Sequence, residues 1–318
     1  MNNMTKSEFT GLSSRDAFGK QLIYLAKEDE RIVAVTADLA SSTRLTEFQH
    51  IYPERFFNFG IAEQDMMGAS AGLALTGKIP FVCTFAAFAS MRACEQARTD
   101  IAYNQLPVRI CASHSGIGLA VGGATHHSLE DLSIFRGMPG MTVLVPADGV
   151  QAAALVKSIM SLTGPSYMRL SRPLELTVYS EDRQFPIGKA DVLKIGNDLT
   201  IIAVGGMVGY SLKAIEELEK DGFKVGLINE YSLKPLDRQA IIEATRNSHA
   251  ILTVEEHNII GGLGSAVAEV LAEEGIAIKF HRHGILDQFT TSAPYEDLIH
   301  FYKLDGEGIA AVARELLK

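Results

Sequence analysis

The chain has 318 residues, of which 47% are hydrophobic, enough apolar material for a large core and, by length, for two domains. Its net charge is −9, and it has no basic run of the kind that binds phosphate backbones, which excludes nucleic acid as an expected partner. No apolar run approaches the roughly 18 residues of a membrane-spanning helix, so no membrane contact is expected either.

The cysteines and the first residues bear on the compartment. Cys83, Cys94 and Cys111 include no CxxC pair, a pattern that suits buried thiols in a reducing environment and neither a disulfide framework nor a zinc site. The start, "MNNMTKSEFTGLSSRDAF", lacks the basic-then-apolar layout of a signal peptide. Together these features predict a cytoplasmic protein.

In the first half of the chain, apolar β-rich runs alternate with helical patterns. Helices are predicted at 14–29, with Ser14 as a plausible cap, and at 148–162, with Asp148 as another. The predicted strands are apolar throughout and do not alternate, which indicates that both sheet faces are covered. They span residues 31–38, 79–85, 108–114, 141–147 and 166–172.

Residues 173–188, "PLELTVYSEDRQFPIG", are polar, carry two prolines and show no period, which is typical of a linker. Beyond them, strands are predicted at 199–206, 224–233, 249–256 and 276–284, separated by helical patterns such as 211–222. The expected fold class is therefore α/β, with two domains that each contain a mostly parallel sheet flanked by helices. We expect domains at 1–172 and 189–318.

The stretch "FNFGIAEQDMMGASAGLAL", residues 57–75, places Glu63 where a short strand enters a helix rich in small residues. Such a helix is expected to pack closely on several sides. Glu63 is then either an ordinary first-turn acid, favoured by the helix dipole, or a carboxylate held in a closed site.

A glycine-rich segment, residues 113–131, follows a strand and precedes a helix, which is where α/β sheets place ligand loops. It contains His114, His126 and His127 but matches neither the dinucleotide nor the phosphate-loop motif. A turn whose backbone needs positive φ would explain the glycines equally well. His281 and His283 lack a third ligand, so no metal site is predicted.

Five motifs occur together in one order: "IAEQDMMGASAGLAL", "TFAAF", "GIGLAVGGATHHSLEDL", "VLVPADG" and "RLSRP". In this order and spacing they resemble the C-terminal half of transketolase, over nearly the whole chain. The same two domains form part of 1-deoxyxylulose 5-phosphate synthase and of the β subunit of 2-oxo acid dehydrogenases. The resemblance implies a pyrimidine-binding domain, a transketolase C-terminal domain and the cofactor thiamine diphosphate.

The resemblance gives Glu63 one role, a hydrogen bond from its carboxyl group to the aminopyrimidine ring of the cofactor. Phe85 and Phe88 match the aromatic wall around that ring, and Met91 stands where transketolases often have tyrosine. Asp38 matches an acid close to the cofactor. Without the resemblance, the spacing of 85, 88 and 91 is most often that of core residues.

Four residues match positions that bind a sugar phosphate in transketolases, where arginine suits phosphate because its planar fork binds two oxygens. They are Arg15, Ser42, His114 and Arg172. His126 matches a histidine over the reacting carbons that hydrogen-bonds substrate hydroxyls or assists proton transfer. Gly122 stands where an acidic residue commonly reads a substrate hydroxyl, which favours an unusual donor or acceptor such as a branched or modified sugar phosphate.

The family holds the cofactor diphosphate through Mg²⁺ with a GDG motif, and no GDG occurs in these residues. We therefore expect a separate N-terminal subunit to hold Mg²⁺ and the diphosphate. The expected assembly is a homodimer of this chain within a heterotetramer of two copies of each subunit, because the family's active sites form across a dimer interface. The second domain is expected to serve assembly and to take no part in the chemistry.

The leading hypothesis is the C-terminal subunit of a two-chain transketolase that moves a two-carbon ketol unit between sugar phosphates. Three alternatives stay open. One is the β subunit of a 2-oxo acid dehydrogenase, which acts with a lipoyl domain. The others are 1-deoxyxylulose 5-phosphate synthase, which usually keeps its domains in one chain, and a non-catalytic regulatory module of the same fold.

Overall fold

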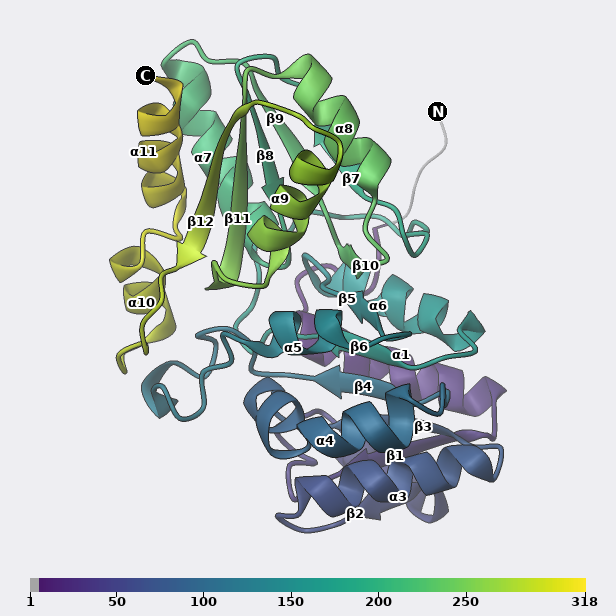
Figure 1. The fold of residues 1–318 in the computed structure, drawn as a ribbon. Helices are drawn as coiled ribbons and strands as arrows, with labels where there is room; N and C mark the ends of the chain where they lie inside the picture. The colour runs from purple at the N-terminus through teal and green to yellow at the C-terminus, as the bar shows by residue number, and fades with distance from the viewer. Residues whose placement is uncertain (1–5) are drawn as a thin grey trace.

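The computed structural model describes residues 6–318, which form two α/β units with one sheet each (Figure 1). The first sheet has seven strands in the order β10-β5-β6-β4-β3-β1-β2, and the second has five in the order β12-β11-β8-β9-β7. All pairings are parallel except those of β10 with β5 and of β7 with β9. The predicted fold class is confirmed.

Among residues 6–172, five strands lie inside the predicted ranges, each a few residues shorter, and the sixth, Phe56–Asn58, is the short strand expected before Glu63. The elements up to residue 172 are α1 (Ser14–Glu28), β1 (Ile32–Thr36), α2 (Thr46–Ile51), η1 (Pro53–Arg55), β2 (Phe56–Asn58), α3 (Glu63–Leu75), β3 (Ile79–Cys83), η2 (Phe88–Arg92), α4 (Cys94–Gln96), η3 (Ala97–Ala102), β4 (Arg109–Ala112), η4 (Ala120–Gly122), α5 (Asp131–Gly137), β5 (Thr142–Leu144), α6 (Gly149–Ser158), η5 (Ile159–Ser161) and β6 (Ser166–Arg169).

The second unit repeats the alternation of strands and helices. Its elements are β7 (Asp191–Lys194), β8 (Leu199–Ala203), α7 (Met207–Lys220), β9 (Val225–Asn229), β10 (Ser232–Lys234), α8 (Arg238–Asn247), β11 (Ala250–Asn258), α9 (Leu263–Glu273), β12 (Lys279–Ile285), α10 (Tyr295–Phe301) and α11 (Gly306–Leu317). β7 was not predicted: its residues are mostly half-buried or exposed at the sheet edge.

The prediction of one strand over 224–233 was wrong. The chain leaves the second sheet after β9, and β10 pairs with β5 at the edge of the first sheet. Between them, Glu230 donates its N–H to Ala203 in the second sheet, and the Tyr231 carbonyl accepts the N–H of Val145 beside the first. An apolar run satisfies a strand in either sheet, so its pattern cannot show the crossover.

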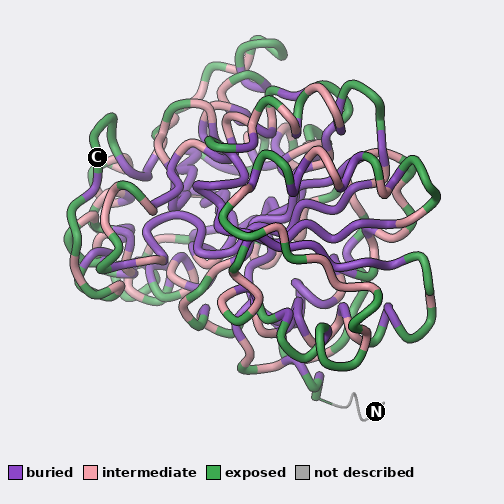
Figure 2. The backbone as a smooth tube through the Cα atoms, turned by 90° about the horizontal axis from the view of Figure 1, so that it is seen from below, coloured by how far each residue is buried: buried purple, intermediate pink, exposed green. Residues whose placement is uncertain are grey.

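Each sheet is covered by helices on both faces, as the continuous apolar strands predicted. One buried layer contains side chains of α1, α6, α7 and α11, and the other contains side chains of α3, α5, α8 and α9. Figure 2 shows the buried backbone running through the middle of the molecule, with the exposed segments at its periphery. The strands of the first sheet are therefore packed between two buried layers, which fix the positions of their carboxyl ends.

The two predicted helix caps had different outcomes. Asp148 accepts the N–H of Gln151 at 3.0 Å and caps α6 as predicted. Ser14 does not cap α1, because Ser13 accepts the Asp16 N–H, while the buried Ser14 hydroxyl accepts the N–H of Ser171. Two adjacent serines satisfy the same capping pattern, and both are buried. The bond of Ser14 with Ser171 leaves the cap to Ser13.

Residues 173–188 form neither a helix nor a strand, apart from a single bridge between Glu181 and Lys6. The segment is not loose, because Asp148 accepts two of its N–H groups, from Val178 and Tyr179, and Phe185 is buried. We keep the division at 1–172, 173–188 and 189–318 as a proposal, and residues 1–5 of the first part lie outside the described residues. Over 6–318, every helix is too short or too polar to traverse a bilayer.

Candidate active site

The predicted site residues gather at the carboxyl ends of parallel strands in the first sheet. Asp38 follows β1, Phe85 follows β3, His114 follows β4 and Arg172 follows β6, while Glu63 begins α3 beyond β2. Because parallel strands present their carboxyl ends at one edge, residues distant in the chain meet there. This edge is where open α/β sheets bind ligands.

Glu63 is a buried carboxylate, 4% exposed, at the start of α3. Its Oε1 lies 3.1 Å from Nη1 of Arg92, whose side chain is 50% exposed. The same guanidinium lies 3.9 Å from the ring centre of Phe88. A hollow of about 790 Å³ borders Glu63 and Arg92 and is further lined by Ile61, Ala62, Gln64 and Asp65. The carboxylate is thus largely shielded from water. The half-exposed Arg92 lies between it and the opening.

The expectation that α3 packs closely on several sides was only partly right. Met66, Met67 and Ser70 are buried, whereas Gly72 and Leu75 on the other side are exposed. Ile61 just before the helix and Tyr103 after η3 are also strongly exposed. Within this chain the small residues therefore leave a helix face uncovered.

The aromatic wall consists of two rings. Phe85 and Phe88 stack with ring centres 5.4 Å apart, and Leu39 and Leu119 pack against them. Met91 lies outside this cluster and is 53% exposed. Its place in the wall stays a prediction, while the two phenylalanines form the apolar surface that a flat ring requires.

His114 lies against the wall, with its ring centre 4.0 Å from that of Phe85 and its Nδ1 2.8 Å from Oγ of Ser113. Burial and, to a smaller extent, the charges of Arg15, Arg172 and Arg44 together lower its pKa to about 3. The imidazole is therefore neutral near pH 7 and can donate or accept a hydrogen bond.

The four residues predicted to bind phosphate come together as a positive cluster. Arg15 donates through Nη1 to the carbonyl of Ser42 at 3.0 Å, and its buried Nε has no partner in the described residues. Arg172 and Arg44 are close enough to Arg15 and His114 to alter their pKa values. Such a cluster with a free buried donor suits an anion that accepts several hydrogen bonds.

Two further predicted residues lie at the margins of this site. His126 stands edge-on to Phe88, with ring centres 5.4 Å apart, and its Nδ1 is 2.9 Å from Oγ1 of Thr125. Asp38 is exposed in the left-handed region, with φ of 57°, and its N–H donates to Asn58. The structure brings His126 to the wall, whereas the role of Asp38 stays a prediction.

Sequence reasoning missed Arg92 and Arg44. Arg92 directly follows the stripe of Phe85, Phe88 and Met91, and this adjacency is a signal that could have drawn attention to it. Arg44 pairs with Asp16 and looks like a surface charge in the sequence. Among residues 6–318, no three His, Cys, Asp or Glu side chains are arranged to hold a metal ion.

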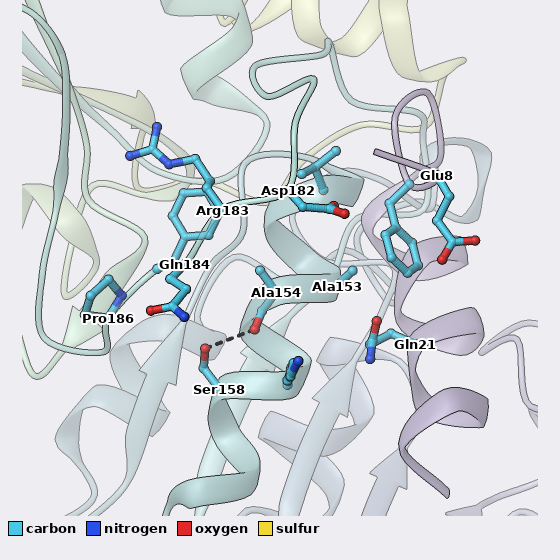
Figure 3. Close-up of a pocket in the computed structure, with 13 residues that line it drawn as sticks. Glu8, Gln21, Ala153, Ala154, Ser158, Asp182, Arg183, Gln184 and Pro186 are labelled. Atoms are coloured by element: carbon cyan, nitrogen blue, oxygen red, sulfur yellow. Dashed lines mark hydrogen bonds between the residues drawn. The ribbon is translucent and has the colours of Figure 1, made fainter. Parts of the chain in front are cut away.

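A second hollow of about 650 Å³ lies between α1, α6 and the linker, as Figure 3 shows. Gln21, Ser158 and Gln184 are among its lining residues. None of the predicted site residues borders it, and it does not touch the carboxyl edge of the sheet. It is therefore not the candidate site.

Residues 10–175 match the transketolase pyrimidine-binding domain, and residues 188–309 match the transketolase C-terminal domain. The chain belongs to the transketolase family. Its two domains are those of the C-terminal section of a transketolase, as the sequence motifs indicated. This transketolase chain therefore carries the half of the fold in which the family places the pyrimidine ring.

Relatives of similar length support that assignment. An apulose-4-phosphate transketolase subunit of Phocaeicola vulgatus is 39% identical, covering 96% of this chain and 98% of its own length. The 6-deoxy-6-sulfo-D-fructose transketolase subunit of a Clostridium species is 39% identical, covering 95% and 94%. The solved structure of a split gene transketolase, an inactive beta4 tetramer, is 44% identical with a TM-score of 0.90, covering 96% and 99%.

Proposed function

We propose that this chain is the C-terminal subunit of a two-chain transketolase that transfers a two-carbon ketol unit between sugar phosphates with thiamine diphosphate. The observation that carries the proposal is the buried Glu63 carboxylate, which borders an opening and which Arg92 links to the ring of Phe88. An ordinary first-turn acid is solvated, whereas this one is 4% exposed.

The residues present fit the cofactor's ring. Glu63 would hold the aminopyrimidine by a hydrogen bond, and Phe85 and Phe88 would cover its faces, with Met91 and Asp38 nearby. When bound, thiamine diphosphate supplies an electron sink for carbon–carbon cleavage. His126, edge-on to Phe88, would hold substrate hydroxyls or carry a proton at the ring's open side.

The substrate's phosphate group would lie on Arg15, Ser42, His114 and Arg172. The buried Nε of Arg15, which has no partner among residues 6–318, supports this, because a buried donor without an acceptor is costly until an anion binds. His114 would donate as a neutral imidazole. The cluster favours sugar phosphates over the oxo acids of a 2-oxo acid dehydrogenase, which carry no phosphate.

The sugar itself is proposed to be unusual. Gly122 provides no carboxylate at the position where transketolases commonly read a hydroxyl. A Cβ there would lie 2.7 Å from Cδ2 of Leu119, so that side chain would have to shift to admit one. Two relatives with the same 39% identity carry the names of different sugars. Identity at this level leaves the sugar open, and a branched or modified sugar phosphate fits the missing acid.

The assembly is proposed to be a heterotetramer of two copies each of this chain and an N-terminal subunit, located in the cytoplasm. Both curated relatives are named as subunits and are matched over nearly their whole length. The N-terminal subunit would hold Mg²⁺ and the diphosphate. Ile61, Leu75 and Tyr103 expose large apolar side chains around α3, where a second copy of this chain would cover them.

The first experiment is titration calorimetry of thiamine diphosphate with Mg²⁺ against the chain alone and against the chain co-expressed with a transketolase N-terminal subunit. Binding in the mixture alone supports a shared site. Tight binding to the lone chain contradicts the two-chain proposal. No binding in the mixture, with association of the subunits shown, favours the non-catalytic module.

A substitution then tests Glu63 itself. Glu63→Ala is expected to reduce ketol transfer in the assembled enzyme by at least about 100-fold, because the ring loses its carboxyl partner. Glu307→Ala is the matched control, since Glu307 is an exposed acid in the first turn of another helix, α11, and does not border the hollow at Glu63. Equal effects of the two substitutions would mean that Glu63 is a helix-dipole acid. Activity that depends on a lipoyl domain would identify an oxo acid dehydrogenase.

A further inference from the structure

The segment that carries His126 is held by the second domain. This segment, residues 113–130, is called the histidine loop below. It leaves the first sheet at the end of β4 and returns at the start of α5. Its middle, η4, contacts α10 of the second domain, and Figure 1 shows the loop beneath that helix.

Contacts with β11 fix the base of the loop. Oε1 of Glu256, on β11, accepts the N–H of Ile117 at 2.7 Å, and its Oε2 accepts the hydroxyl proton of Tyr295 at 2.8 Å. The N–H of Asn258 donates to the carbonyl of Leu129 at 3.0 Å. Gly116 permits this approach, because a Cβ there would lie 2.2 Å from the Glu256 carboxylate. Both sides of the loop base are therefore joined to β11.

Two more contacts hold the tip. Ser292 donates its hydroxyl proton to the Val121 carbonyl at 2.7 Å, and Oγ1 of Thr290 lies 2.6 Å from Nδ1 of His127. Both residues belong to the segment between β12 and α10. Thr290 and His127 are 6% and 5% exposed, so water does not compete for their hydrogen bond.

The hydrogen bonds of His127 define its tautomer. Nε2 lies 2.9 Å from the Ala120 carbonyl, which can only accept, so Nε2 carries the proton. Burial lowers the pKa of His127, and the neutral ring therefore accepts the Thr290 hydroxyl proton at Nδ1. His127 thus links Thr290 to Ala120 on the opposite side of the loop. His127 itself directly follows His126 in the chain.

We propose that the second domain positions His126 through Thr290, Ser292 and Glu256, and so takes part in catalysis as well as in assembly. This inference rests on the proposed function for the role of His126, but the loop contacts are independent of it. His126 is held at the wall by Phe88 and by the fixed conformation of its neighbour. Thr290, Ser292 and Glu256 are positioning residues, since they touch the loop and not the reacting atoms.

The test uses Thr290→Val, which removes the hydroxyl at constant shape. Thr290→Ser restores the donor, and Thr291→Val makes the same change at the adjacent exposed residue as a matched control. Amide hydrogen exchange of residues 117–127 in the full chain is expected to accelerate at least about tenfold in Thr290→Val alone. The ¹⁵N signals of His127 should shift in that variant, because Nδ1 loses its donor.

In the assembled enzyme, Thr290→Val is expected to lower kcat at least about tenfold with thiamine diphosphate affinity unchanged, and Thr290→Ser should recover most of it. Unchanged exchange and unchanged His127 signals in Thr290→Val would overturn the inference. So would a loosened loop that leaves kcat as in the wild type. If wild-type enzyme shows no transketolase activity, the proposed function fails, and exchange alone decides whether the second domain holds the loop.

A milder variant protects the test against misfolding. Ser292→Ala removes one hydroxyl at an exposed position and is expected to accelerate exchange at residues 121–123 while leaving residue 117 protected. Equal acceleration across the whole chain would indicate general destabilisation and contradict a local role. Faster exchange confined to the loop, without a change in the unfolding midpoint, supports it.

Discussion

Two buried glutamates of this chain are satisfied in opposite ways. Glu63 is paired with Arg92, a half-exposed side chain that lies at an opening. Glu256 is held by the Ile117 N–H and the Tyr295 hydroxyl, and β11 around it is joined to a fully buried ion pair, since Arg169 donates to both the Glu256 carbonyl and Asp131. The first carboxylate has a partner that solvent reaches, whereas the second bonds a buried backbone N–H and a part-buried hydroxyl. A ligand site needs the first arrangement, and a support needs the second.

The largest effect on stability is expected where the buried contacts of Arg169 and Asp131 next to Glu256 are broken. Asp131→Asn removes the charge that Arg169 contacts at 2.8 Å and that Tyr167 contacts at 2.6 Å, all buried. Breaking a buried pair in this way should cost about 3–5 kcal/mol of unfolding free energy, measured by urea denaturation. Glu269→Gln, which breaks an exposed pair with Arg136, is the control and should cost less than about 1 kcal/mol. Equal losses would show that burial does not distinguish the two pairs.

A pH experiment sharpens the comparison at Glu255, the buried neighbour of Glu256 on β11. Glu255 caps α9 through the N–H groups of Leu263 and Gly264, and burial raises its pKa from 4.5 to about 7. Its contribution to stability is therefore complete below pH 4.5 and is lost as the pH rises through about 7.

Glu255→Gln removes this titration. The free energy of unfolding of the Glu255→Gln variant, minus that of the wild type, should rise by up to about 1.4 kcal/mol per pH unit between the two pKa values. It should stay constant above them. Urea unfolding of both proteins at several pH values between about 4 and 9 would measure it. A difference that does not change with pH would contradict the raised pKa.

The smallest effect is expected at the open carboxylate. Arg92→Met removes the guanidinium but keeps the apolar stem, and should cost the isolated chain about 1 kcal/mol, because one partner is half exposed. The guanidinium and the aminopyrimidine would contact the same carboxylate and the same ring. Thiamine diphosphate affinity in the assembled enzyme should therefore be unchanged or tighter.

Calorimetry with the N-terminal subunit present measures this affinity, and Arg98→Met, another partly exposed arginine of the same segment, serves as the control. Weakening of thiamine diphosphate binding by more than about tenfold in Arg92→Met would show that Arg92 holds the cofactor and does not merely occupy its place.

Much of the candidate site could be placed from motifs, whereas the residues that support it could not. Glu63, Phe85, Phe88 and His126 stand in local patterns that place them at strand and helix ends, and the structure brings the two phenylalanines and His126 together. Arg92 acquires its importance from contacts with Glu63, 29 positions away. Thr290 acquires its importance from His127, 163 positions away, and a lone threonine between a strand and a helix carries no sequence signal.

By itself, the sequence determined the alternation of strands and helices and the parallel sheets, because hydrophobic periodicity and turn residues act over short distances. The family followed from the five motifs that the chain shares with transketolases. Tertiary structure alone decided that β10 crosses to the first sheet, that Ser13 caps α1 in place of Ser14, and that the second domain holds the histidine loop. These outcomes depend on which groups become buried together, and burial makes each unpaired polar group costly enough to select its partner.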